Sequence, residues 1–229
     1  VLKYDDVTYA ANIKTILFHE TSWEYSAPLI NLNNGEQLEL SFDDLDGDQK
    51  QYSISFIHCN ADWTPSNLKS SEYLEGFFEF NIITYSFSVG TYQKFTHYKV
   101  QFPSSLSQQY TRFKLSGNYM LFVFENGDTE KPVFSKRFMV VDSKASIQCS
   151  IRQPVSDAKP GGQQLELTMD LNASSVANVQ RDVYIRVFQN NRWDNVSEHI
   201  QPQFVQGNRL SFQFNKELMF EGGNEYRPL

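Results

Sequence analysis

Apolar and polar residues alternate along much of this chain with the two-residue period of a β-strand. The segment 38–42 places Leu, Leu and Phe on one side and polar residues between them, and the segment 98–102 repeats this arrangement. Successive side chains of a strand point to opposite faces, so each segment predicts a strand with one face in a hydrophobic core. No segment shows the period of a long helix. We expect only a short helical turn after Thr64 and Pro65, because Thr caps helices and Pro fits their first position.

Two further segments, 119–124 and much of 132–141, are apolar on both faces of the predicted strand. Strands of this kind have both faces covered, so we predict that they lie centrally in a sheet. Between them, Asn126, Gly127 and Asp128 are residues that tight hairpin turns favour. The two segments are therefore predicted to form a β-hairpin.

A second series of alternating segments begins after Asp142. The ranges 145–151, 164–171 and 210–215 each predict a strand. Segments rich in loop and turn residues separate these strands: 154–162, 172–177, 190–191 and 207–208. Such spacing is typical of immunoglobulin-like and fibronectin-like folds. The chain of 229 residues is therefore predicted to be all-β, with two consecutive β-sandwich domains at 1–142 and 143–229, the second smaller than the first.

The aromatic content, the net charge and the lengths of the apolar runs limit the kinds of partner that this chain is expected to bind. Aromatic residues make up 15% of the chain, which suits the half-buried surfaces of sheets. The net charge is −7 without a basic cluster, so nucleic acid is not an expected partner. No apolar run approaches the roughly 20 residues that span a bilayer. The sequence starts at Val1 without a visible leader, which is compatible with a mature or trimmed secreted protein.

The two cysteines, Cys59 and Cys149, fall on either side of the expected domain boundary, so we expect no disulfide between them. Cys149 alternates with Ile147 and Ile151 on the apolar face of a predicted strand. We therefore predict that Cys149 is a buried free thiol.

An acidic loop is the first candidate for a chemical site, and it holds Asp43, Asp44, Asp46 and Asp48. Carboxylates are hard oxygen ligands that suit Ca²⁺. The spacing does not match an EF-hand, because Gln49 and Ser55 stand where Gly and Glu are required. A structural turn is the favoured interpretation, since carboxylates in turns accept backbone N–H bonds and Gly47 can adopt a positive φ.

His58, Cys59 and Asp62 invite a catalytic interpretation, because a nucleophilic thiol needs a base and an orienting carboxylate. Neighbouring residues of a regular strand point to opposite faces, so His58 and Cys59 would not converge. The four histidines of the chain include no HExxH motif, and no paired CxxC is present. A glycosidase-like pair of Asp62 and Glu72 is a weaker possibility, because nothing in the sequence fixes their separation.

Aromatic residues near predicted loops and strand ends are a further possible binding signal: Trp23, Tyr25, Trp63, Phe77, Phe78, Tyr85, Phe87 and Trp193. With nearby Asn and Asp they could hold a sugar, or they could anchor a protein interface. Alternatively, they fold back over the ends of the sandwiches. The sandwich fold alone does not discriminate among these roles.

Several motifs carry a resemblance to a known family. The first two are FDDLDGD at 42–48 and FIHCNADWTPS at 56–66, and LSGNY at 115–119 and DTEKPVFSKRFMVVD at 128–142 extend the similarity. Together they resemble the first domain of the plug proteins of the Bacteroidetes type IX secretion system. In the second domain the resemblance rests on FEGGNEYR at 220–227.

The resemblance implies a non-enzymatic component of an export machine. Plug proteins are associated with the giant outer-membrane translocon barrel and close its periplasmic opening when its lateral-gate partner is absent. It therefore implies a periplasmic location and the barrel as partner, with no catalytic site, cofactor, metal or small-molecule ligand. Members of the family continue beyond the position of Leu229, so a C-terminal portion is expected. The alternative from the residues themselves is a secreted carbohydrate-binding β-sandwich.

We expect the loops 43–49 and 60–67 to lie together at one end of the first sandwich and to face the barrel. The candidate partner-binding residues are Asp44, Asp46, Asp48, Asn60, Asp62, Trp63 and Asn67. The alternative is that this motif locks a corner of the sandwich, with Trp63 buried and Pro65 fixing the turn.

Overall fold

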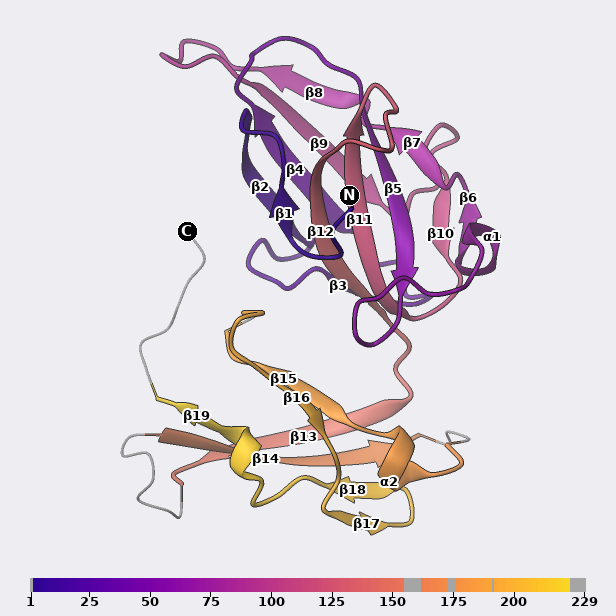
Figure 1. Cartoon of the computed structure of the whole chain (residues 1–229), viewed down its shortest axis with the longest axis vertical. Coiled ribbons are helices and arrows are strands. Elements are labelled where there is room, and N and C mark those ends of the chain that lie inside the picture. Colours follow the sequence, from indigo (N-terminus) through magenta and orange to yellow (C-terminus); the bar gives the residue numbers. More distant parts are fainter. Residues whose placement is uncertain (1, 155–161, 173–175, 191, 223–229) are drawn as a thin grey trace. The chain divides into compact units, whose positions relative to one another are not determined.

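The computed structural model describes residues 2–154, 162–172, 176–190 and 192–222. The chain divides into two compact units, Val1–Asp142 and Ser143–Leu229, and each is described here by itself. No helix among the described residues is long and apolar enough to cross a membrane. Both units are built almost entirely of strands (Figure 1), which confirms the predicted all-β sandwich class.

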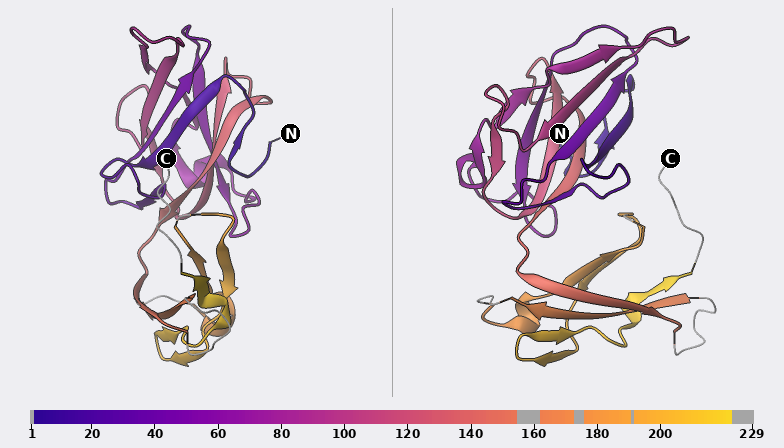
Figure 2. Two further views of the ribbon diagram at one scale, coloured as in Figure 1. Left: turned by 90° about the vertical axis from the view of Figure 1, so that its left-hand side faces the viewer. Right: turned by 180° about the vertical axis from the view of Figure 1, so that it is seen from behind.

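The first unit has two main sheets, seen from other directions in Figure 2. One has the order β2 (Ile13–Glu20), β4 (Leu38–Asp44), β9 (Thr96–Phe102) and β8 (Thr84–Phe87). The other has the order β1 (Val7–Thr8), β12 (Pro132–Val141), β11 (Gly117–Glu125), β5 (Tyr52–Cys59) and β7 (Glu79–Asn81), and β3 (Leu29–Asn31) pairs with β12. The short helix α1 (Ser70–Tyr73) leads directly into β6 (Leu74–Gly76). β6 pairs with β10 (Thr111–Phe113) in a separate two-stranded sheet.

An aromatic core joins these two sheets. The predicted apolar faces of β4 and β9 are buried, and the ring of Phe42 stacks on that of Tyr98 with their centroids 5.2 Å apart. Phe134, from β12 in the opposite sheet, packs edge-on against Phe42 at 5.1 Å. Aromatic pairs in these geometries stabilise a core beyond the area that they bury.

The hairpin predicted from 119–124 and 132–141 is formed by β11 and β12. Its turn places Asn126 and Gly127 at φ values of 54° and 69°. β11 is buried on both faces, as predicted. On the outer face, the ring of Tyr4 lies 5.9 Å from that of Phe122, so the segment that precedes β1 contributes to the cover.

The helical turn predicted after Thr64 and Pro65 is wrong. Pro65 forms an antiparallel bridge with Cys59, and the helix α1 begins only at Ser70. The chain instead turns back on the end of β5, with the N–H of Trp63 donating to the carbonyl of Asn60 at 3.0 Å. This pairing fixes an extended backbone at a position where local sequence favoured a helix.

The second unit has one larger and one smaller sheet. The larger sheet has the order β13 (Ala145–Arg152), β14 (Gly162–Leu171), β18 (Arg209–Ser211) and β17 (Phe204–Gln206), and β19 (Met219–Glu221) also pairs with β14. The smaller sheet pairs β15 (Ile185–Phe188) with β16 (Val196–Ile200). The unit also holds the helix α2 (Val179–Asp182) and the 3₁₀ turn η1 (Lys216–Leu218). Its core includes Leu167, Met169, Ile200, Leu210 and Phe212.

The predicted burial of Cys149 is wrong. Cys149 alternates with Ile147 and Ile151 on β13 as expected, but all three are exposed. In the described part of the chain β13 pairs with β14 alone, so it is an edge strand there. Parts of the segments expected at 154–162, 172–177, 190–191 and 220–227 lie outside the described residues, and an immunoglobulin-like topology stays a prediction.

Candidate functional site

The acidic loop between β4 and β5 is organised around the buried carboxylate of Asp44. This carboxylate accepts hydrogen bonds from the side chain of Asn12 at 2.6 Å and the hydroxyl of Tyr52 at 2.9 Å. It also accepts one from the backbone N–H of Asp46 at 3.1 Å. Burial alone would raise the pKa of Asp44, but these hydrogen bonds and that from Lys50 outweigh it and hold the pKa below its ordinary value.

Lys50 forms ion pairs with three carboxylates of this loop. Its ammonium nitrogen lies 3.0 Å from Asp44 Oδ2, contacts the carboxylate of Asp46 and lies 3.9 Å from Asp48 Oδ1. Although burial opposes the charged form, hydrogen bonds to Asp46 and Asp44 raise the pKa of Lys50 above its ordinary value. No group of three or more His, Cys, Asp or Glu side chains in the described ranges is arranged to hold a metal ion. The contacts of Asp44 with Asn12, Tyr52 and Lys50 are those of a structural turn.

The acidic loop also supports the hairpin formed by β8 and β9. The hydroxyl of Thr96 donates to the carbonyl of Asp48 at 2.7 Å, and the side chain of Gln93 donates to the carbonyl of Leu45 at 3.1 Å. Gly47, at φ 71°, lies so close to Lys94 that a Cβ on the glycine would be 2.9 Å from the Cβ of Lys94. The loop thus packs against the hairpin where β9 begins.

The β8–β9 hairpin carries apolar side chains into solvent, at Ile83, Tyr85, Phe87, Val89 and Tyr92. β8 is an edge strand and is exposed along its whole length. The loop that joins β8 to β9 projects beyond the strands of the first unit (Figures 1 and 2). Sequence reasoning identified Tyr85 and Phe87 but missed Val89 and Tyr92. The sequence does contain a signal for this exposed hairpin, because residues 83–93 form an uncharged run that is rich in aromatic, Ser and Gly residues.

The Trp63 corner, formed by residues 60–67, differs from the β8–β9 hairpin because its aromatic side chain is buried. Trp63 is only 6% exposed, adopts φ 66°, and packs its ring under the guanidinium of Arg137 at 4.9 Å. The carboxylate of Asp62 accepts hydrogen bonds from the N–H and the hydroxyl of Thr64 at 3.0 and 2.6 Å. Asn60, Asp62 and Asn67 are exposed. The geometry supports the alternative in which this motif locks a corner with Trp63 buried.

The expectation that the two loops share one end of the sandwich is wrong. The loop 45–51 leads into β5 and the loop 60–67 leaves it. A strand rises about 3.3 Å per residue, so the eight residues of β5 hold the two loops ~26 Å apart. Asp44, Asp46 and Asp48 therefore lie at one end of β5, and Asn60, Asp62, Trp63 and Asn67 at the other.

His58 and Cys59 form hydrogen bonds with different partners. The Nδ1 atom of His58 lies 2.9 Å from Ser66 Oγ, while the thiol of Cys59 donates to the carbonyl of Ile57 at 3.6 Å. Burial raises the pKa of Cys59 to about 11, so its nucleophilic thiolate is scarce near neutral pH. Glu72 accepts a bond from the N–H of Lys69 at the start of α1, which gives it a capping role.

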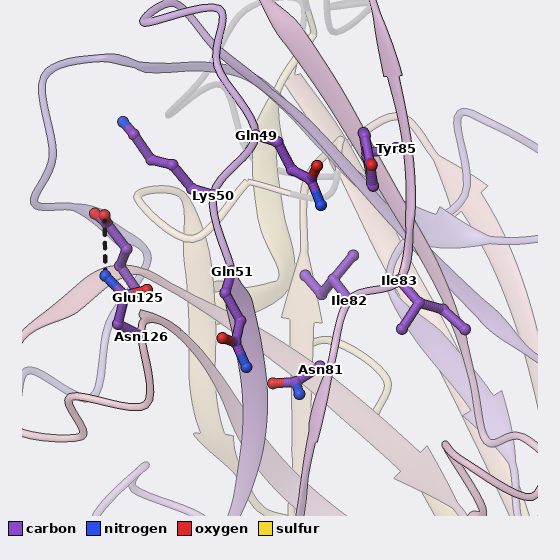
Figure 3. A pocket seen from close by; sticks show the side chains of 9 residues that line it. All are labelled: Gln49, Lys50, Gln51, Asn81, Ile82, Ile83, Tyr85, Glu125 and Asn126. Atoms are coloured by element: carbon purple, nitrogen blue, oxygen red, sulfur yellow. Dashed lines mark hydrogen bonds between the residues drawn. The ribbon is translucent and has the colours of Figure 1, made fainter.

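A hollow of about 610 Å³ lies beside β8 and is drawn in Figure 3. Four side-chain amides and one aromatic ring line it with other residues: Gln49, Gln51, Asn81, Asn126 and Tyr85. The amide of Gln49 points toward the side on which Tyr85 lies, whereas Lys50 points away from it (Figure 3). The hollow thus places four side-chain amides near an aromatic ring, and the charged residues Lys50 and Glu125 also line it.

Comparison with known proteins identifies the family. Residues 13–142 match the family model described as "Type 9 secretion system plug protein 1st domain". A crystal structure of a hypothetical protein from Parabacteroides merdae aligns with a TM-score of 0.90 and 30% identity over 99% of this chain. The chain spans 56% of the length of that protein.

Two other results add nothing to this assignment. The alkylpurine DNA glycosylase AlkC of Pseudomonas fluorescens, bound to DNA containing an abasic site analogue, aligns with a TM-score of 0.33 and 16% identity. That alignment covers 56% of this chain and 30% of the glycosylase, and its score is too low to support any argument. No curated protein sequence matches. The match over 13–142 shows that this chain belongs to the family of type 9 secretion system plug proteins.

Proposed function

We propose that this protein is a non-enzymatic component of the type IX secretion system that binds the outer-membrane translocon barrel and occludes its periplasmic opening. The observation that carries the proposal is the match of residues 13–142, nearly all of the first unit, to the plug family. Its location in this proposal is the periplasm, at the barrel.

The geometry of the first unit supports a binding role. Its aromatic core and its bonded loops make a stiff body, and a stiff surface binds without a large loss of conformational entropy. The residues that suggested chemistry have structural partners: Asp44 with Lys50, His58 with Ser66, and Glu72 with Lys69. These contacts explain the polar residues without an enzymatic reaction.

The predicted contact residues divide into two sets. Asp46 and Asp48 lie beside the β8–β9 hairpin, while Asn60, Asp62 and Asn67 lie at the other end of β5. Asp44 and Trp63 are buried, so their effect on a partner would be indirect. Because the two sets lie at opposite ends of β5, a single compact contact with the barrel would include one set and exclude the other.

Capture of the barrel tests the proposal. The purified, tagged chain is incubated with solubilised outer membranes of a Bacteroidetes strain that lacks the lateral-gate partner and carries an epitope-tagged barrel. We expect the barrel to be retained with the chain and detected through its epitope. Absence of the barrel from the fraction retained by a folded chain would contradict the proposed function.

A second candidate function is carbohydrate binding, and the hollow beside β8 is the observation that favours it. Sugars stack on aromatic faces and exchange hydrogen bonds with amides, and Tyr85 lies with four amides in this hollow. A glycan array tests it directly. Binding that Tyr85→Ala abolishes would support this function, and an array without signal would remove it.

A further inference from the structure

Charge along the chain singles out one segment of the first unit. Between Glu79 and Glu125 the sequence has no Asp or Glu, although the whole chain contains 27. The β8–β9 hairpin lies in this segment, and the only charged residue from Ile83 to Phe95 is Lys94. In the described part of the chain no ion pair engages Lys94. The hairpin is therefore apolar and uncharged at its tip, and Lys94 lies at its base beside the acidic loop.

The tip of this hairpin does not pack against its own unit. Val89 is 91% exposed and Tyr92 is fully exposed, while Phe87 is 53% exposed behind them. Single exposed apolar residues are common on proteins, but a cluster at the end of a projecting element is typical of an interaction site. A tyrosine at such a position supplies a large contact area with only two side-chain torsions to fix.

The hairpin is held in place before any partner binds. The N–H of Ser88 donates to the carbonyl of Phe95 at 2.9 Å, and the N–H of Phe95 donates to the hydroxyl of Ser88 at 3.0 Å. The acidic loop fixes the base of the hairpin through Gln93 and Thr96. A preorganised element loses less entropy on binding than a mobile loop does.

We propose that the tip of the β8–β9 hairpin, formed by Phe87, Val89 and Tyr92, is the element that enters the opening of the translocon barrel. It seats in an apolar recess of the barrel wall, and a carboxylate at the rim of that recess pairs with Lys94. This inference rests on the proposed function and assigns its contact to one end of the first unit. It places the loop 60–67, at the other end of β5, outside this contact.

The test compares two double variants in the capture assay with the epitope-tagged barrel. Val89→Ser with Tyr92→Ser removes the apolar tip, and Trp23→Ser with Tyr25→Ser removes an aromatic pair of the same unit that is also exposed. Both pairs are outside the core, so circular dichroism and melting should match those of the wild type. We expect the tip variant to retain at least ~10-fold less barrel, as when a central interface residue is truncated. The control variant should stay within about twofold of the wild type.

The outcomes separate this inference from the proposed function. A wild type that captures no barrel overturns both. A wild type that captures the barrel, with a tip variant that captures it equally well, overturns the hairpin contact and leaves the proposed function standing. Equal losses of barrel capture in both double variants would mean that exposed aromatic residues bind the barrel non-specifically. That result would also overturn the hairpin contact. Wild-type binding to protein-free vesicles of outer-membrane lipid that the tip substitutions abolish would assign the hairpin to the lipid surface instead.

Discussion

The ammonium group of Lys50 lies 3.0 Å from the buried carboxylate of Asp44. The side chain of Asp44 is fully buried and that of Lys50 is 16% exposed. Water therefore screens this pair less than it screens an ion pair on the surface. Because the same loop packs against Gln93, Lys94 and Thr96, the pair positions the base of the β8–β9 hairpin as well as closing a turn.

Replacing Asp44 by Asn should lower the free energy of unfolding by ~2–3 kcal/mol, because it removes a charge-assisted partner and leaves the partly buried Lys50 without its one fully buried anion. Denaturant unfolding at neutral pH measures this. Asp48→Asn is the matched control, since Asp48 is 66% exposed and 3.9 Å from Lys50, and it should change stability by less than ~0.5 kcal/mol. Equal effects of the two substitutions would contradict the central role of Asp44.

The stability of the wild type should also depend on pH through Asp44. Its pKa in the folded state lies below the ordinary value, so its contribution is present above the unfolded pKa of about 4 and is lost as the pH falls through the folded value. We expect the free energy of unfolding to fall below pH 5 more steeply in the wild type than in Asp44→Asn. Parallel curves for the two proteins would show that Asp44 is not responsible.

Gly47→Ala and Gly90→Ala form a matched pair that measures the contact between loop and hairpin. Both glycines have φ near 70°, but a Cβ at position 47 meets Lys94 at 2.9 Å, whereas one at position 90 meets nothing within 4 Å. Each substitution carries the cost of a left-handed conformation, ~1–2 kcal/mol. We expect Gly47→Ala to cost at least ~1 kcal/mol more in denaturant unfolding, because overpacking adds to that cost. Similar costs would mean that Lys94 yields without strain.

The two thiols should differ in reactivity. Cys149 is exposed, while Cys59 is buried with its pKa raised to about 11. A thiol-specific chromogenic reagent should modify one cysteine rapidly in the native protein and the second only on unfolding. Cys149→Ser should remove the rapid phase. A rapid phase that persists in this variant would place Cys59 in contact with solvent.

Trp63→Ala should lower the free energy of unfolding by ~3–5 kcal/mol, because it empties a buried site and removes the ring beneath Arg137. Asn67→Ala, at an exposed position of the same loop, should change stability by less than ~0.5 kcal/mol. If Trp63→Ala keeps the stability of the wild type, Trp63 is not part of the core and a direct role in binding becomes the better explanation.

The Trp63 corner shows why part of the site escaped the sequence. The residues 60–67 contain good turn and helix-start signals, but the observed conformation depends on pairing between Pro65 and Cys59 and on Arg137, far along the chain. Likewise, the sequence predicts that the acidic loop and the Trp63 loop form one surface. They are held apart because β5 runs as a single extended strand between them.

By itself, the sequence determined which residues share a face of each strand, the central hairpin of β11 and β12, the all-β class and the resemblance to the plug family. These features depend on alternation, turn residues and short motifs, which are local. Only the tertiary structure decided which faces are covered. Ile147, Cys149 and Ile151 have the pattern of a buried face and are exposed, whereas Trp63 lies in a loop and is buried. Burial requires contact with segments distant in the sequence, and period-two alternation does not specify that contact.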